Sequence, residues 1–248
     1  MGLKSAIQIN FDSIEKLKYL LLEKHFPHGF DSKPVILVMC SGGPDSLALL
    51  DRINSYVRIN SLNYGVEAWH FNYEDNYSDI EQSYVKRYCE KNDINLHIVS
   101  SSSSGLPVFM GNGLESTWRK QRYMSVRDFQ LSALAQKDPI LYIPVTAHTK
   151  DDVIETMLMN FVRNPGIIKE DFFSPVSEIV FSDFTVARPI LKCTKDSIYQ
   201  HLRVFKIPYF QDPNNSDPKF LRSRVRNELL PLIKSINSGF GKKVFNEA

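Results

Sequence analysis

Cysteine is scarce in this sequence, and long apolar runs are missing from it. The 248 residues include only three cysteines, Cys40, Cys89 and Cys193, and no two of them form a C-x-x-C pair. Such usage favours a reducing setting without a zinc or iron–sulfur site. There is no run of about 18 apolar residues, the length that crosses a membrane. Residues 1–10 lack the apolar stretch of a signal peptide. We therefore expect no membrane partner and a cytoplasmic location.

Net charge is also low. Thirty Lys and Arg against 28 Asp and Glu leave a formal charge of +2, which does not by itself indicate nucleic acid. Any RNA contact must come from local basic clusters. The length allows one main domain with an appendage. We expect an N-terminal helix on the core in residues 1–33, a nucleotide-binding domain in 34–191 and a C-terminal helical extension in 192–248.

Two familiar phosphate-binding motifs are absent, yet residues 35–50 have the layout of a phosphate site. An unbroken apolar run, Val35–Met39, predicts a strand buried on both faces. A small-residue loop follows, and the apolar spacing after it predicts a helix from Ser46. The loop lacks both the Gly-Lys-Ser/Thr ending of a P-loop and the Gly-x-Gly-x-x-Gly fingerprint. Its glycines and the helix N-terminus nevertheless favour an anion. The alternative is a tight turn whose glycines serve packing alone. The loop residues are Ser41, Gly42, Gly43, Pro44, Asp45 and Ser46.

Further strands are expected at 66–72, 95–100, 140–145 and 181–187, with helical patterns between them. Ser78-Asp-Ile-Glu81 reads as a capping box at the start of one of these helices. Strands that alternate with helices predict right-handed crossovers. The predicted fold is α/β: a doubly wound, parallel five-stranded sheet with helices on both faces and a small C-terminal helical extension.

A polar segment follows the fourth expected strand. Parallel sheets bind ligands beyond the carboxyl ends of their strands, where the winding reverses. This segment and the Ser41–Ser46 loop would face each other there if their strands are neighbours. Its carboxylates could hold Mg²⁺ on ATP phosphates or receive an ammonium group. Alternatively, the aspartates only complement a helix N-terminus. The side chains concerned are His148, Asp151, Asp152 and Glu155.

Two basic clusters complete the candidates. The spacing of Glu115, Arg119 and Arg122 puts them on one helix face, as a binding surface or as a solvent ion pair. A second cluster places three arginines within five residues. These could bind phosphate or RNA backbone, or they could form a solvated helix start. The three are Arg222, Arg224 and Arg226.

Taken in order, these segments resemble one enzyme family over about residues 35–233. The motifs are Ser41-Gly-Gly-Pro-Asp-Ser46, Trp69-His-Phe-Asn72, Leu114-Glu-x3-Arg-x2-Arg-Tyr123, Ala147-His-Thr-Lys-Asp-Asp-Val-Ile-Glu-Thr156, Arg188-Pro-Ile-Leu191 and the Asp212–Pro231 segment with its arginines. Together they resemble the tRNA(Ile)-lysidine synthetases of the PP-loop ATP pyrophosphatase superfamily. The resemblance implies that ATP adenylates the C2 oxygen of the wobble cytidine in tRNA(Ile) with a CAU anticodon. L-Lysine then displaces AMP.

The resemblance also implies residue roles. Asp45, Arg119, His148 and Asp152 would be catalytic, and the Ser41–Ser46 loop would bind ATP, with Asp45 meeting Mg²⁺. Cytidine, lysine and tRNA would be bound by Glu115, Arg122, Asp151, Glu155, Arg222, Arg224 and Arg226. Which carboxylate meets lysine stays open, as does the choice between a monomer and a homodimer.

Three departures from the family pattern keep other functions open. Thr149 and Val153 stand where the family usually has histidine and glutamine, and residues 164–173 lack the expected glycine-rich loop. One alternative is a tRNA thiolation enzyme with the same ATP loop, although such enzymes commonly use paired cysteines. The other is a non-catalytic protein that binds nucleotide or RNA.

Overall fold

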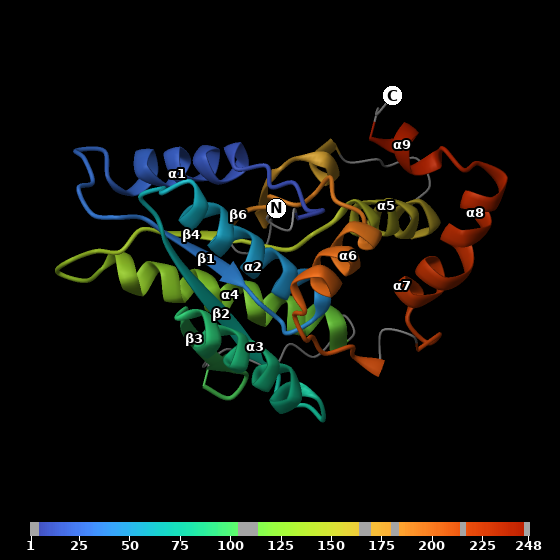
Figure 1. Ribbon diagram of the computed structural model, residues 1–248, viewed down its shortest axis with the longest axis horizontal. Coiled ribbons are helices and arrows are strands. Elements are labelled where there is room, and N and C mark those ends of the chain that lie inside the picture. The colour runs from blue at the N-terminus through green and yellow to red at the C-terminus, as the bar shows by residue number, and fades with distance from the viewer. Residues whose placement is uncertain (1–4, 104–113, 164–169, 180–183, 214–216, 246–248) are drawn as a thin grey trace.

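The core of the protein is a six-stranded sheet (Figure 1). The computed structural model describes residues 5–103, 114–163, 170–179, 184–213 and 217–245. Each of the five expected strands overlaps a strand of this sheet. The strands are β1 (Val35–Met39), β2 (Gly65–Asn72), β3 (Asn95–Ser100), β4 (Tyr142–Val145), β5 (Val176–Ile179) and β6 (Phe184–Ala187).

The strand order is β3-β2-β1-β4-β6-β5, and all neighbours from β3 to β6 run parallel. β5 is antiparallel to β6, with Val176 opposite Ala187. The expected five parallel strands are therefore corrected to six in the described chain, with one antiparallel edge strand. β5 reads Val-Ser-Glu-Ile and is mostly half-buried. It therefore lacks the continuous apolar run by which the buried parallel strands were found.

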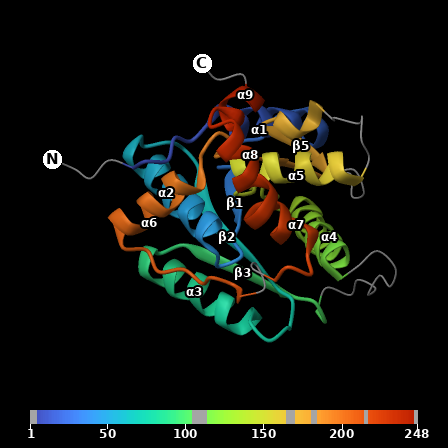
Figure 2. The same cartoon turned by 90° about the vertical axis from the view of Figure 1, so that its right-hand side faces the viewer.

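Helices cover both faces of the sheet, which confirms the doubly wound α/β class. α1, α2, α3 and α6 share one apolar cluster with the β1 side chains Ile36 and Val38. α4 packs against Leu37 and Met39 on the opposite face, and Figure 2 shows α2 and α6 across the sheet from α4. The helices are α1 (Asp12–His25), α2 (Pro44–Ile59), α3 (Ser78–Asn92), α4 (Leu114–Leu134), α5 (Lys150–Arg163), α6 (Lys195–Phe205), α7 (Leu221–Arg224), α8 (Leu230–Ile236) and α9 (Phe240–Val244), with a 3₁₀ turn η1 (Glu170–Phe173) and a π-helical turn η3 (Val225–Leu229).

The start of α2 and the capping of α3 differ from expectation. α2 begins at Pro44, not at Ser46, because Gly43 serves as the N-cap and proline suits the first helical turn. α3 does begin at Ser78, but Ser78 is not its cap. The Asp75 carboxylate instead accepts hydrogen bonds from the backbone N–H groups of Tyr77 and Ser78, so the expected capping box is wrong.

The C-terminal helices pack on α5. Ile154 and Leu158 of α5 form a separate apolar cluster with Val225 of η3 and Leu230 of α8. Since α5 follows β4 directly, this packing brings the arginine-rich segment to the carboxyl end of the sheet.

Candidate active site between the β1 and β4 ends

β1 and β4 are neighbours in the sheet, with Val38 beside Val145. The winding reverses between them, because β2 and β3 lie on one side and β6 on the other. The loop after β1 and the start of α5 after β4 therefore meet at the edge where an open parallel sheet binds ligands. This is the arrangement expected from the sequence.

The Ser41–Ser46 loop is held in shape by its own side chains. The Ser46 hydroxyl donates to the Gly43 carbonyl at 3.0 Å and accepts from the Ser41 N–H at 3.2 Å. Gly42 has φ +89°, and a Cβ there would lie 2.6 Å from the backbone oxygen of Glu81. Glycine is therefore required at position 42 by conformation and by close approach to α3. The loop is preformed at the N-terminus of α2, where an anion is favoured.

Across from this loop, Asp152 lies in the first turn of α5. Its Oδ2 accepts from the Thr149 N–H at 2.9 Å and from the Thr149 hydroxyl at 2.7 Å. This contact caps the helix, so the capping alternative holds in part. Its Oδ1 lies 3.3 Å from Nη2 of Arg222. Asp152 thus both starts the helix and faces the cationic side chains of the site.

Lys195, the first residue of α6, joins the two sides. Its Nζ lies 2.7 Å from Oδ2 of Asp45 and 3.4 Å from Oδ2 of Asp152. Burial disfavours the charged carboxylate of Asp152, yet Lys195 and Arg222 lower its pKa overall. Burial likewise disfavours the ammonium, but the Asp152 and Asp45 carboxylates raise the pKa of Lys195 overall. An ammonium group therefore already lies between the Ser41–Ser46 loop and the carboxylates of α5, Asp152 and Glu155, which we call the acidic rim.

Lys195 was not among the site residues predicted from the sequence. Thr194 caps α6 through a side-chain bond from the Ser197 N–H, and α6 follows β6, whose carboxyl end opens on the same edge as that of β4. The available signal was a lysine that directly follows the cap of the helix after a parallel strand.

Glu155 is the most buried carboxylate of the site, with 1% of its side chain exposed. Arg226 contacts it with Nε at 2.6 Å and Nη2 at 2.9 Å. Arg222 contacts it with Nε at 2.9 Å. The two arginines thus lie beside the acidic rim, where they fasten η3 and α7 to α5. Their proposed contact with substrate stays a prediction.

Two of the predicted residues pair with other groups: Asp151 with the Lys195 backbone and Lys234, and Arg224 with Glu228. Oδ2 of Asp151 accepts from the Lys195 backbone N–H at 2.9 Å, and its Oδ1 lies 3.5 Å from Nζ of Lys234. Arg224 is exposed and pairs with Glu228 at 3.2 Å. The structure therefore does not bring Arg224 to the cluster of Asp152 and Glu155.

His148 borders the site, and Arg119 of α4 lies close enough to affect its charge. The pKa of His148 is lowered to about 3, first by burial and then by Arg119, so the imidazole is neutral near pH 7. Its Nδ1 lies 2.9 Å from the Thr146 hydroxyl. The guanidinium of Arg119 lies 5.1 Å above the ring of Tyr123. Arg122 donates to the Tyr73 hydroxyl at 3.3 Å. The side chain of Glu115 lies outside the described residues.

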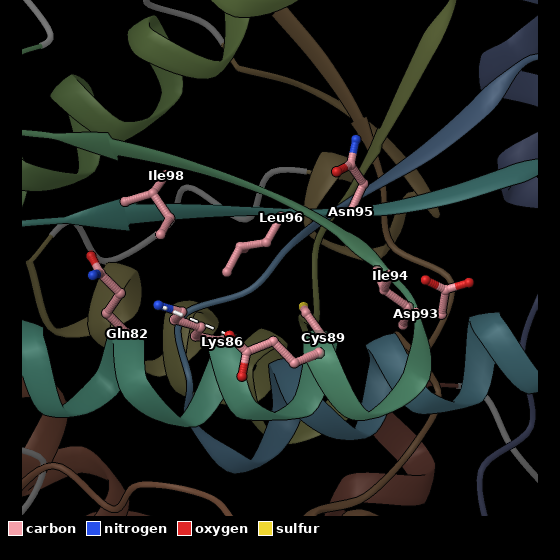
Figure 3. A pocket seen from close by; sticks show the side chains of 9 residues that line it. Gln82, Lys86, Cys89, Asp93, Ile94, Asn95, Leu96 and Ile98 are labelled. Atoms are coloured by element: carbon pink, nitrogen blue, oxygen red, sulfur yellow. Dashed lines mark ion pairs between the residues drawn. The ribbon is translucent and has the colours of Figure 1, made fainter.

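A hollow of about 550 Å³ lies elsewhere, between α3 and β3 (Figure 3). Lys86 and Glu90 form an ion pair at its edge, 3.9 Å apart, and none of the predicted site residues lines it. Cys89 also faces it, but burial raises the pKa of this thiol to about 12. A neutral thiol is a poor nucleophile, so this hollow offers no evident chemistry.

Comparison with known proteins places this arrangement in a family. The model of the PP-loop domain family matches residues 12–233. The chain therefore belongs to the PP-loop domain family, which confirms the resemblance drawn from the ordered motifs.

Among curated proteins, the chain is similar to tRNA(Ile)-lysidine synthases. The bifunctional protein TilS/HprT of Listeria monocytogenes is 33% identical over 91% of this chain and 33% of its own length. The tRNA(Ile)-lysidine synthase of Borreliella burgdorferi is 30% identical over 89% of this chain and 48% of its own length. That of Prochlorococcus marinus is 28% identical over 88% and 64%. The chain thus spans less than two thirds of these relatives.

Among solved structures, the chain resembles a U34-tRNA thiolase, NcsA, from Methanococcus maripaludis with its [4Fe-4S] cluster. The TM-score is 0.63 at 18% identity, over 92% of this chain and 75% of that chain. At this identity the likeness shows a shared fold only.

Proposed function

We propose that this chain uses ATP to attach L-lysine to C2 of the wobble cytidine in tRNA(Ile) with a CAU anticodon, giving lysidine, AMP and pyrophosphate. The observation that carries the proposal is the ammonium of Lys195, which lies between Asp45 of the anion-binding loop and Asp152 of the acidic rim. A site that seats an ammonium beside a phosphate loop suits a reaction between an amino acid amine and an ATP-activated group.

In the first step, the C2 oxygen of cytidine bonds to the α-phosphorus of ATP and the bond to pyrophosphate breaks. The backbone N–H groups of the Ser41–Ser46 loop and the α2 N-terminus would receive the negative charge of the pyrophosphate. In the second step, the ε-amine of lysine bonds to C2, AMP leaves with the bonding electrons, and the amine gives up a proton. The Asp152 side of the site would position this amine.

Magnesium fits the loop side of the site. Oδ1 of Asp45 is buried and has no hydrogen-bond partner among the described residues, and a carboxylate oxygen is a ligand that Mg²⁺ prefers. No group of three His, Cys, Asp or Glu that could hold a metal occurs in the described part of the chain. Asp45 would therefore share the ion with ATP phosphates. The ion would supply positive charge at the phosphates.

Two further roles belong to the proposal. His148, neutral near pH 7, and Arg119 would contact the cytidine or its adenylate. We place the reaction in the cytoplasm, where its tRNA substrate would be. As a separate finding, no helix in the described ranges is long and apolar enough to cross a membrane.

The test is incorporation of labelled L-lysine into a tRNA(Ile) transcript with a CAU anticodon, in the presence of ATP and Mg²⁺. We expect label in the RNA and release of AMP, both lost in Asp45→Ala. Asp138→Ala is the matched control, because Asp138 is exposed in the α4–β4 connection. If the wild-type chain incorporates no lysine, the proposal is wrong. AMP release with sulfur transfer in place of lysine would favour a thiolation enzyme, and binding without AMP would favour a non-catalytic protein.

A further inference from the structure

The ammonium of Lys195 occupies a position that the proposed reaction needs for a substrate amine. Oδ2 of Asp152 already accepts from the N–H and hydroxyl of Thr149 at 2.9 and 2.7 Å, and Lys195 is its third donor at 3.4 Å. A carboxylate oxygen has two lone pairs. An ammonium that binds at Oδ2 would therefore replace a donor that is already there.

Lys195 is the donor that can leave. The Thr149 contacts belong to the cap of α5, whereas the Lys195 contact to Asp152 is the longest of the three and comes from a flexible four-carbon stem. The backbone of Lys195 is fixed separately, because its N–H donates to Asp151 at 2.9 Å. The ammonium can move while α6 stays in place.

If the Lys195 ammonium leaves Asp152, the Ser41–Ser46 loop is the nearest place where it can bind. Lys195 lies 2.7 Å from Asp45, which is in the first turn of α2, next to the loop that would hold ATP phosphates. The polyphosphate of ATP brings negative charge to this point, and it would attract the Lys195 ammonium away from Asp152. A bound nucleotide would thereby free Oδ2 of Asp152 to accept a hydrogen bond from the amine of the substrate lysine. We call this place the amine position.

We propose that Lys195 enforces an order of binding, in which its ammonium blocks the amine position at Asp152 until ATP binds and draws it to the phosphates. This inference rests on the proposed function, and it adds that lysine binds second. A tethered group competes at an effective concentration in the millimolar range, and affinity falls with the fraction of open sites. We therefore expect ATP to strengthen lysine binding by about tenfold or more.

Isothermal titration calorimetry with L-lysine tests this order. The wild-type chain is titrated without nucleotide and with Mg²⁺ and α,β-methylene-ATP, which cannot release pyrophosphate. We expect tight binding only with the analogue, whereas Lys195→Met binds lysine tightly in both states. Lys195→Arg keeps the positive charge and should behave as wild type. So should Lys192→Met, because Lys192 is exposed on the same connection.

Equal lysine affinity of the wild type with and without the analogue overturns the proposed order. The order is also overturned if, without nucleotide, Lys195→Met binds lysine no more tightly than the wild type does. Thermal unfolding checks that the variant is folded, and Lys195→Gln replaces it if it is not. If labelled lysine enters the tRNA but the wild type binds lysine equally well with and without the analogue, the binding order is wrong and the proposed function stands. No lysine binding in any state, together with no incorporation, overturns both.

Discussion

The buried Glu155 carboxylate should be the strongest electrostatic link between α5 and the C-terminal helices. Glu155→Gln removes its charge and leaves two guanidinium groups facing a neutral amide. Breaking a buried ion pair costs about 3–5 kcal/mol. Glu155 is 1% exposed, but Arg222 and Arg226 are 29% and 33% exposed and are partly stabilised by water. We therefore expect a loss of about 2–3 kcal/mol in the free energy of unfolding.

For a chain of this length, that loss corresponds to about 4–12 °C in Tm. The assay is thermal and urea unfolding followed by circular dichroism at pH 7. The matched control is Glu228→Gln, which breaks an exposed pair whose side chains are 59% and 56% exposed. The control should cost under about 1 kcal/mol.

A double-mutant cycle isolates the pair itself. Glu155→Gln combined with Arg226→Gln should give a coupling energy well above that of Glu228→Gln with Arg224→Gln. If Glu155→Gln destabilises the chain no more than Glu228→Gln, burial does not strengthen this interaction, and the account of how the C-terminal helices are fastened is refuted.

Three further predictions concern the surroundings of the site. Gly42→Ala should destabilise the chain by about 1–3 kcal/mol, because its Cβ would meet the Glu81 backbone; Gly43→Ala, whose Cβ meets nothing closer than 3.5 Å, should cost less in the same urea titration. Burial, with Asp212 and Asp75, raises the pKa of Glu81 to about 8 from 4.5, so the folded state holds the extra proton and stability should fall as pH rises between those values. Glu81→Gln should lack that slope. The pKa of His148 is lowered from 6.5 to about 3, so the unfolded state binds the extra proton and stability should fall as pH drops below 6.5. His148→Gln should lose that dependence, and an unchanged slope in either variant contradicts the assigned environment.

The anion-binding loop could be predicted from sequence because all its determinants are adjacent. A buried strand, two glycines, a proline and a helix follow one another within residues 35–50. Each is a local preference of the backbone, which neighbours in the chain settle. The facing of this loop and the α5 start was also predictable, because parallel topology puts successive strand ends on one edge.

The ion pairs of the site could not be predicted in the same way. Lys195 and Asp45 are 150 residues apart, and Arg226 and Glu155 are 71 apart. Their pairing depends on how α6 and η3 pack, which no local pattern encodes. The three arginines at 222–226 look alike in sequence, yet Arg222 and Arg226 turn towards α5 while Arg224 faces solvent. Helical spacing separates Arg224 from the other two, but which face of the helix meets α5 depends on tertiary packing.

The balance of charge in the site explains why substrates must exchange with side chains. Asp45, Asp152 and Glu155 each pair with at least one of the cationic side chains Lys195, Arg222 and Arg226. An added ammonium competes with the resident cation at the carboxylate it binds, and added phosphate favours movement of that cation. Glu155 is enclosed by two arginines, whereas Oδ1 of Asp45 is buried and has no hydrogen-bond partner within the described parts of the chain. The movable part of the balance is therefore at Asp45, Lys195 and Asp152, where nucleotide and amine would have to meet.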